Sequence, residues 1–147
     1  MTTQGKKILY YEDQPEMVAI IQLMLKKKLG LEVMNATTPT EVREALAANC
    51  FDLILLDIRI FCEETIENPE RDWRREGLFF LEELRCGKIP GTTPIDIPVL
   101  VLTAVANTAD VDKILEVGSR EKARLAYLSK PAHLESVEKA VMELLSE

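Results

Sequence analysis

Five polar side chains stand just after short apolar runs in this chain. They are Glu12, Asp13, Asp57, Thr103 and Lys130. The runs before them occupy residues 8–11, 53–56, 99–102 and 125–128. Unbroken apolar runs of this length are typical of strands that are buried on both faces of a parallel sheet. Because ligands of open α/β sheets bind outside the carboxyl ends of the strands, we expect these five side chains to share one crevice.

Three carboxylates, one hydroxyl and one ammonium in one crevice would form a site for a divalent cation and a phosphoryl group. Mg²⁺ prefers octahedral coordination by oxygen, and it takes one or two carboxylates together with water and phosphate oxygens. Asp13 and Asp57 could supply those carboxylates, and Glu12 could hold a metal-bound water. Lys130 would offset negative charge on a transferring phosphoryl group. The sequence therefore predicts Mg²⁺ as a cofactor.

Helical patterns separate the predicted strands, and a fifth strand is predicted at residues 31–36. The first helix is indicated by apolar side chains at helical spacing, at Met17, Ile20, Ile21, Met24 and Leu25. Thr38 and Glu41 have the spacing of a capping box at the start of a second helix. The order of elements is (βα)₅, which indicates an α/β fold with a doubly wound, parallel five-stranded sheet. We expect a single domain over residues 1–147, with its core at about residues 6–146.

The composition argues against several other classes of protein. A net charge of −7 disfavours direct binding to nucleic acid, which usually needs a basic face. The three cysteines lack CxxC spacing, so they indicate free thiols and neither a disulfide framework nor a zinc site. No segment approaches the roughly 18 apolar residues of a membrane span, and the N-terminal segment lacks the features of a signal peptide. We therefore expect a cytoplasmic protein that does not enter a membrane.

The five polar positions resemble those of the receiver domain of response regulators in two-component signalling systems. An acidic pair follows the first strand, Asp57 the third, Thr103 the fourth, and Lys130 with its following proline the fifth. All stand in the order of that family, and the similarity runs over residues 7–145. The resemblance implies the flavodoxin-like receiver fold.

By this resemblance, Asp57 is the phosphoacceptor and the backbone carbonyl of Arg59 is a further metal ligand. Thr103 donates its hydroxyl to the phosphoryl group, and Tyr127 is the aromatic side chain that turns inward when the threonine moves. The peptide bond after Lys130 is cis. The implied function is a phosphorylation-activated switch in a phosphorelay. Its only catalysis would be its own phosphoryl transfer and autodephosphorylation, so we do not expect an enzyme in its own right.

The resemblance also implies which partners this chain meets. The phosphoryl donor would be a sensor histidine kinase or a phosphotransfer protein, and a stand-alone receiver would signal by contact with an unidentified protein target. Phosphorylation could also drive homodimerisation. Two other functions stay open at this point. One is an interaction module that keeps the receiver fold without using phosphorylation, and the other is a metal-dependent phosphatase, which the absence of a second acid close after Asp57 disfavours.

The segment after Asp57 departs from the family pattern. The proline that is usual soon after the phosphoacceptor is missing, and the matching glycine is Gly77, much later than usual. The intervening insertion, at about residues 61–75, mixes both signs of charge with the aromatic residues Phe61 and Trp73. Long charged segments of this kind are usually solvated loops. Because this one leaves the strand end that carries Asp57, we expect it to pack beside the site and to change the lifetime of an aspartyl phosphate by screening it from water.

Overall fold

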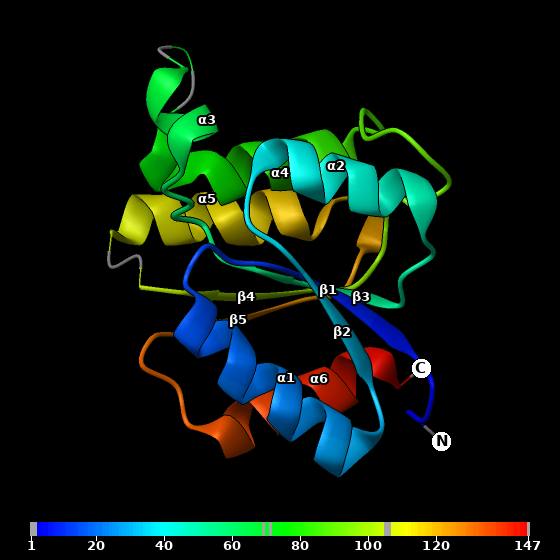
Figure 1. The fold of residues 1–147 in the computed structure, drawn as a ribbon. Helices are drawn as coiled ribbons and strands as arrows, with labels where there is room; N and C mark the ends of the chain where they lie inside the picture. The colour runs from blue at the N-terminus through cyan, green and yellow to red at the C-terminus, as the bar shows by residue number, and fades with distance from the viewer. Residues whose placement is uncertain (1–2, 69, 71, 105–106, 147) are drawn as a thin grey trace.

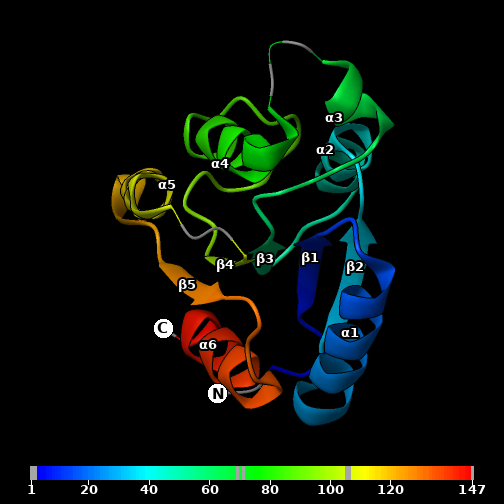
Figure 2. The ribbon, with the colours of Figure 1, turned by 90° about the vertical axis from the view of Figure 1, so that its left-hand side faces the viewer.

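Five parallel strands form one sheet in the computed structural model, which describes residues 3–68, 70, 72–104 and 107–146. The strands are β1 (Lys7–Tyr11), β2 (Glu32–Ala36), β3 (Leu53–Leu56), β4 (Val99–Thr103) and β5 (Leu125–Ser129). Figure 1 labels these strands, and Figure 2 shows their order across the sheet, which is β2-β1-β3-β4-β5. The strand order reverses between β1 and β3, and such a reversal opens the crevice in which ligands of open α/β sheets bind.

Helices cover both faces of this sheet. The longer ones are α1 (Pro15–Leu29), α2 (Pro39–Ala48), α4 (Glu76–Arg85), α5 (Thr108–Gly118) and α6 (Leu134–Leu145). The helices α1 and α6 lie on one face, and α2, α4 and α5 lie on the other (Figure 2). None of the helices in the described part of the chain has the length and apolar character needed to cross a membrane. The predicted α/β fold with a doubly wound, parallel five-stranded sheet is confirmed.

Local sequence signals account for the ends of the first two helices. Pro15 occupies the first turn of α1, and Gly30 ends that helix with a φ of 69°, where a glycine has no Cβ to clash. The Thr38 hydroxyl accepts a hydrogen bond from the N–H of Glu41 at 3.1 Å, which makes it the N-cap of α2. The Glu41 carboxylate accepts in return from the N–H of Thr37 at 2.8 Å. The capping box is therefore present, but the Glu41 side chain accepts from the N–H of the residue before the N-cap and not from that of the N-cap itself.

Burial follows the prediction for the central strands and departs from it at two places. Every residue of β3 and β4 is buried, as is all of β1 after Lys7. The residues of β5 are only half-buried or exposed, because β5 is an edge strand that pairs with β4 alone.

On α1, Ile20 is 54% exposed although we expected it to face the core, and Val18 is buried instead. The apolar face of α1 is thus rotated slightly from the predicted one.

The insertion after Asp57 is folded, although long charged segments of this kind are usually solvated loops. It contains a short helix, α3 (Glu63–Glu67), and a 3₁₀ turn, η1 (Trp73–Arg75). A second 3₁₀ turn, η2 (Arg120–Lys122), precedes β5. The hydroxyl of Thr65 is buried and donates to the Ile60 carbonyl at 2.8 Å. The Glu64 carboxylate accepts the hydroxyl of Thr40 at 2.5 Å, and this bond holds α3 against the start of α2.

Candidate functional site

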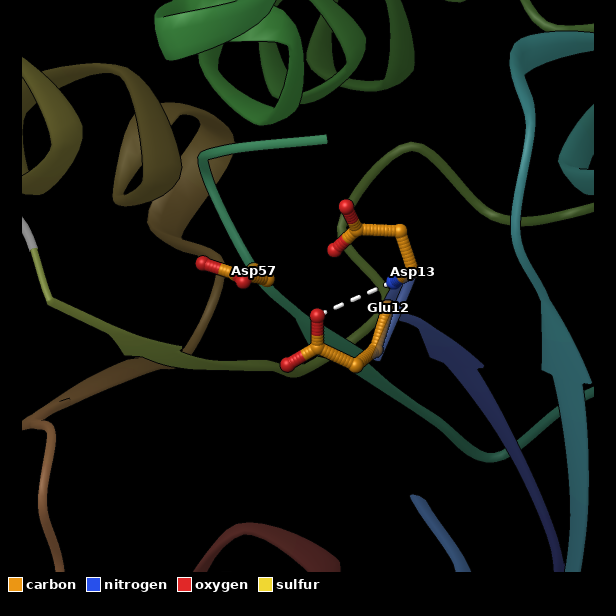
Figure 3. A group of neighbouring side chains, drawn as sticks. All are labelled: Glu12, Asp13 and Asp57. Atoms are coloured by element: carbon orange, nitrogen blue, oxygen red, sulfur yellow. Dashed lines mark hydrogen bonds between the residues drawn. The ribbon is translucent and has the colours of Figure 1, made fainter. Parts of the chain in front are cut away.

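Three carboxylates meet at the carboxyl end of the sheet, at the reversal between β1 and β3. Glu12 and Asp13 follow β1 and Asp57 follows β3, and each offers an oxygen within 4.8 Å of the other two. Glu12 and Asp57 are buried, whereas Asp13 is partly exposed. Figure 3 shows the three side chains near one another at the ends of β1 and β3. The structure therefore brings together the three acids that the sequence singled out.

Lys130 supplies the positive charge of this cluster. Its ammonium lies 2.5 Å from Oε1 of Glu12 and 3.1 Å from Oδ2 of Asp57. The lysine directly follows β5, and its N–H donates to the Thr103 carbonyl at 2.8 Å, which continues the pairing of β5 with β4. The bond between Lys130 and Pro131 is cis, as the family resemblance implied. The lysine thus reaches across the end of β4 to the acids that follow β1 and β3.

The electrostatics of the cluster leave it short of positive charge. Burial and the charge of Asp57 raise the pKa of Glu12 from 4.5 to about 8, although Lys130 acts in the opposite direction. Burial by itself would lower the pKa of Lys130, but the charges of Asp57 and Glu12 outweigh this effect and raise it. A buried acid keeps its proton when neighbouring charges of the same sign are not offset. A divalent cation among the three carboxylates would supply the missing positive charge.

Backbone N–H groups fix one oxygen of each carboxylate. Oδ1 of Asp57 accepts from the N–H of Ile58 at 2.7 Å and from that of Arg59 at 3.3 Å. Oδ2 of Asp13 accepts from the N–H of Phe61, the first residue of the insertion, at 2.9 Å. Oε2 of Glu12 accepts from the N–H of Asp13 at 2.9 Å (Figure 3). The insertion therefore begins in contact with the site, as expected.

Gly77 lets the start of α4 approach the end of β3 closely. Its N–H donates to the Ile58 carbonyl at 2.8 Å. A β-carbon on residue 77 would lie 2.2 Å from the carbonyl oxygen of Asp57 and 2.6 Å from the Cα of Ile58. Both atoms belong to the main chain and neither can turn away. Only glycine fits here, which supports the assignment of Gly77 as the delayed family glycine.

Thr103 and Tyr127 lie on neighbouring strands beside the cluster. Thr103 is fully buried, and its hydroxyl has no hydrogen-bond partner among the residues that the structure describes. Buried hydroxyls are normally hydrogen-bonded, so this one is available to a further acceptor. Tyr127 is two residues before Ser129, the partner of Thr103 in β5, so it faces the same side of the sheet. It is half-buried and packs against the core cluster under α2, α4 and α5.

The donor set suits a hard divalent cation. Glu12, Asp13 and Asp57 offer only carboxylate oxygens, which are ligands that Mg²⁺ takes together with water. Few protein ligands are present, so several coordination positions would stay with water or phosphate oxygens. Arg59 lies beside the acids through its N–H bond to Asp57, and its carbonyl stays a predicted ligand.

Residues of the insertion also line a cavity of about 490 Å³ next to the site. The lining residues come from the insertion side and from the segment after β4, and they are Arg59, Asp72, Arg74, Arg75, Ala104, Asn107 and Asp110. Arg75 pairs with Asp110 at 3.2 Å and so ties the insertion to the start of α5. Sequence reasoning missed this cavity and the N–H of Phe61. Main-chain donors leave no signal in the residue types, and the ion pair joins positions far apart in the chain.

Comparison with known proteins identifies the fold and a family. Residues 8–142 match the family described as the response regulator receiver domain. No curated protein matches the chain.

Solved structures with this architecture cover nearly the whole chain. A CheY-like receiver domain protein from Methanospirillum hungatei JF-1 has a TM-score of 0.72 at 21% identity, covering 97% of this chain and 94% of its own. The receiver domain of the Francisella response regulator 1452 has a TM-score of 0.71 at 23% identity, covering 96% and 97%. The receiver domain of sensor histidine kinase PA1611 from Pseudomonas aeruginosa PAO1, with a magnesium ion in its active site cleft, has a TM-score of 0.70 at 24% identity, covering 97% and 99%. At these identities the likeness establishes the fold.

Proposed function

This chain belongs to the response regulator receiver family, and we propose that it is a switch activated by phosphorylation of Asp57. The observation that carries the proposal is the position of the Lys130 ammonium, 3.1 Å from Asp57 and 2.5 Å from Glu12. A partly buried lysine that lies between acids at the ends of two central strands is suited to hold a phosphoryl group on one of those acids. A structural ion pair would not need the third acid, Asp13, within reach of the same space.

The chemistry is a phosphoryl transfer to a carboxylate. An oxygen of Asp57 forms the bond to phosphorus while the bond from phosphorus to the donor breaks, and the bonding electrons leave with the donor. The donor is a phosphohistidine, which leaves as imidazole, or an acyl phosphate, which leaves as a carboxylate. Lys130 offsets the charge of the transferring group, which is where most catalysis of such transfers lies. Glu12, Asp13 and Asp57, with the Arg59 carbonyl as a further ligand, would hold Mg²⁺, which would supply positive charge to offset that of the phosphoryl oxygens.

The switch links the phosphoryl group to the face of α5 and β5. The buried hydroxyl of Thr103 gains an acceptor when a phosphoryl oxygen arrives, and its movement frees space at the end of β4. Tyr127 lies on the same face one strand away and turns inward into that space. The new dianion thereby shifts the population between two packings of the same fold.

The biological setting follows from this switch. A sensor histidine kinase or a phosphotransfer protein donates the phosphoryl group, and an unidentified protein target binds the altered face, with phosphorylation-dependent homodimerisation as a further output. The acidic chain does not bind nucleic acid directly, and we place it in the cytoplasm as a single receiver domain over residues 1–147. It is a regulatory domain whose catalysis is confined to its own phosphorylation and dephosphorylation.

Two alternatives make different predictions. A phosphorylation-independent interaction module would keep the fold without binding a cation, although Glu12, Asp13 and Asp57 still converge here. A metal-dependent phosphatase would turn over a phosphorylated substrate. Neither alternative accounts as directly as a phosphoryl acceptor site does for the buried hydroxyl of Thr103, which has no hydrogen-bond partner within the described part of the chain.

Labelling with acetyl phosphate and Mg²⁺ tests the proposal. Intact mass should show one added phosphoryl group on the wild type and none on Asp57→Asn. Asp52→Asn is a matched control that should label fully, because Asp52 lies at the other end of β3, where its carboxylate accepts from the N–H of Lys7. Full labelling of Asp57→Asn would overturn the assignment, and turnover of free acetyl phosphate without a labelled protein would favour the phosphatase.

A further inference from the structure

Trp73, near the end of the insertion, contacts the three residues at its start, 59–61. The carbonyl oxygen of Trp73 accepts the N–H of Ile60 at 3.1 Å. Its ring meets the ring of Phe61 edge to face, with the centroids 4.9 Å apart. The guanidinium carbon of Arg59 lies 5.9 Å from the centroid of the same ring. Trp73 therefore holds residues 59–61 as a unit.

Those three residues hold two of the acids of the site. The N–H of Phe61 donates to Asp13 at 2.9 Å, and the N–H of Arg59 donates to Asp57 at 3.3 Å. The two acids follow different strands, β1 and β3, so the segment spans the gap between them. A shift of the segment would release Oδ2 of Asp13 and would remove the longer of the two N–H bonds to Oδ1 of Asp57, the shorter one coming from Ile58 at 2.7 Å. The contacts of Trp73 are thus one step away from the atoms that would hold a cation.

The buried hydroxyl of Thr65 also holds this segment, because it donates to the carbonyl of Ile60 at 2.8 Å. The side-chain contacts that tie the insertion to other helices are weaker. The ion pair of Arg75 with Asp110 and the bond of Glu64 to Thr40 lie on exposed side chains, and exposed charged pairs contribute little. Aromatic pairs and cations on aromatic faces contribute beyond the area they bury. Trp73 combines both kinds of contact with a backbone hydrogen bond.

We propose that Trp73 is a positioning residue for the metal site, an inference that rests on the proposed function. By packing on Arg59 and Phe61, it keeps their N–H groups aimed at Asp57 and Asp13, so that the carboxylates are already placed when Mg²⁺ arrives. The insertion then orients the carboxylates of the site, in addition to any screening of the site from water. Partners that orient metal ligands commonly change metal affinity by 10- to 100-fold when they are removed.

Calorimetric titration of the full chain with Mg²⁺ tests this role. Trp73→Ala should bind Mg²⁺ about tenfold more weakly than the wild type, at the lower end of such effects, while the folded core is kept. Trp73→Phe keeps an aromatic ring for Phe61 and Arg59 and should recover most of the affinity. The matched control is Ile66→Ala, since Ile66 belongs to the same insertion and is 53% exposed. Its affinity should equal that of the wild type.

Amide hydrogen exchange supplies a second readout that does not depend on the cation. The N–H of Phe61 should exchange faster in Trp73→Ala than in the wild type or in Ile66→Ala, because its bond to Asp13 is less well held. If Trp73→Ala does not fold, Phe61→Ala takes its place, since it removes the ring contact and keeps the N–H. Unchanged Mg²⁺ affinity in a folded variant of either kind, or an equal loss in Ile66→Ala, would overturn the inference. A wild type that does not bind Mg²⁺ would overturn the proposed function as well, so the two failures are distinguishable.

Discussion

Replacing Gly77 with alanine should destabilise the protein, although alanine is the better helix former. The residue lies in the first turn of α4, and its N–H donates to the carbonyl of Ile58 at 2.8 Å. A β-carbon there would lie 2.2 Å from the Asp57 carbonyl oxygen and 2.6 Å from the Cα of Ile58. Side chains can rotate away from such contacts, but main-chain atoms of a buried strand end cannot. The start of α4 must therefore move away from Asp57.

Three contributions decide the sign and size of the change in the free energy of unfolding. One of them stabilises the variant and two destabilise it. Alanine gains at most about 1 kcal/mol over glycine in a helix. Forcing an extra methyl into a packed site typically costs about 1–3 kcal/mol. Lengthening or breaking the bond from residue 77 to Ile58 costs about 1 kcal/mol more. The net expectation is a loss of about 2 kcal/mol in the free energy of unfolding.

Urea unfolding followed by circular dichroism measures this difference. The matched control is the reverse exchange at an open position, Ala109→Gly, because Ala109 is exposed in the first turn of α5. It reports the helix preference alone and should cost no more than about 1 kcal/mol. If Gly77→Ala is as stable as the wild type, the close approach of α4 to β3 does not constrain the fold and the reasoning is wrong.

Two further predictions concern the buried polar groups of the site. Without metal, the wild type should lose stability as the pH rises from about 4.5 to about 8, because the raised pKa of Glu12 makes the folded state bind its proton more tightly than the unfolded chain does. Urea titrations with a chelator should show that Glu12→Gln removes on the order of 4 kcal/mol of this loss. Equal changes of the free energy of unfolding with pH in both proteins would contradict the prediction. Thr103→Val removes a buried hydroxyl that has no partner among the described residues, so it should be as stable as the wild type or about 1 kcal/mol more stable. The same variant should still accept a phosphoryl group, but NMR should show no phosphorylation-dependent change in α5. If α5 changes on phosphorylation as it does in the wild type, Thr103 is not the switch.

The placement of the acids and the lysine could be predicted because the geometry of a parallel sheet leaves little choice. Runs that are buried on both faces must be strands, and their carboxyl ends meet at one edge. Glu12, Asp13 and Asp57 follow such runs, and Lys130 follows the edge strand of the same parallel sheet, so their convergence follows from the order of elements. The one strand whose burial was wrong is β5, and an edge position depends on the strand order, which local sequence does not contain.

Contacts between distant segments carry what the sequence could not predict. Arg85 is 3% exposed, and its guanidinium donates to the carbonyls of Ile95, Ile97 and Gly118 at 2.8, 2.8 and 2.9 Å. A basic residue at the end of a helix is usually solvated. Arg85 can be buried because the loop before β4 and the end of α5 supply these carbonyl acceptors. The folded insertion has the same origin. Its short elements lack a long periodic pattern, and they are held by contacts to α2, α5 and Asp13, which lie far away in the sequence.

The insertion can be added to the fold at little cost because its two ends lie side by side. Gly77 donates to the carbonyl of Ile58, and Ile60 donates to the carbonyl of Trp73, so the chain leaves and returns at one place. Closing a longer loop between adjacent ends costs only slightly more free energy than closing a short one. The helix α4 therefore starts against β3 whatever the length of the segment before it. Any influence of the insertion on the acids must then pass through residues 59–61, where Trp73 packs, and this makes Trp73 the position at which such an influence can be changed without disturbing the sheet.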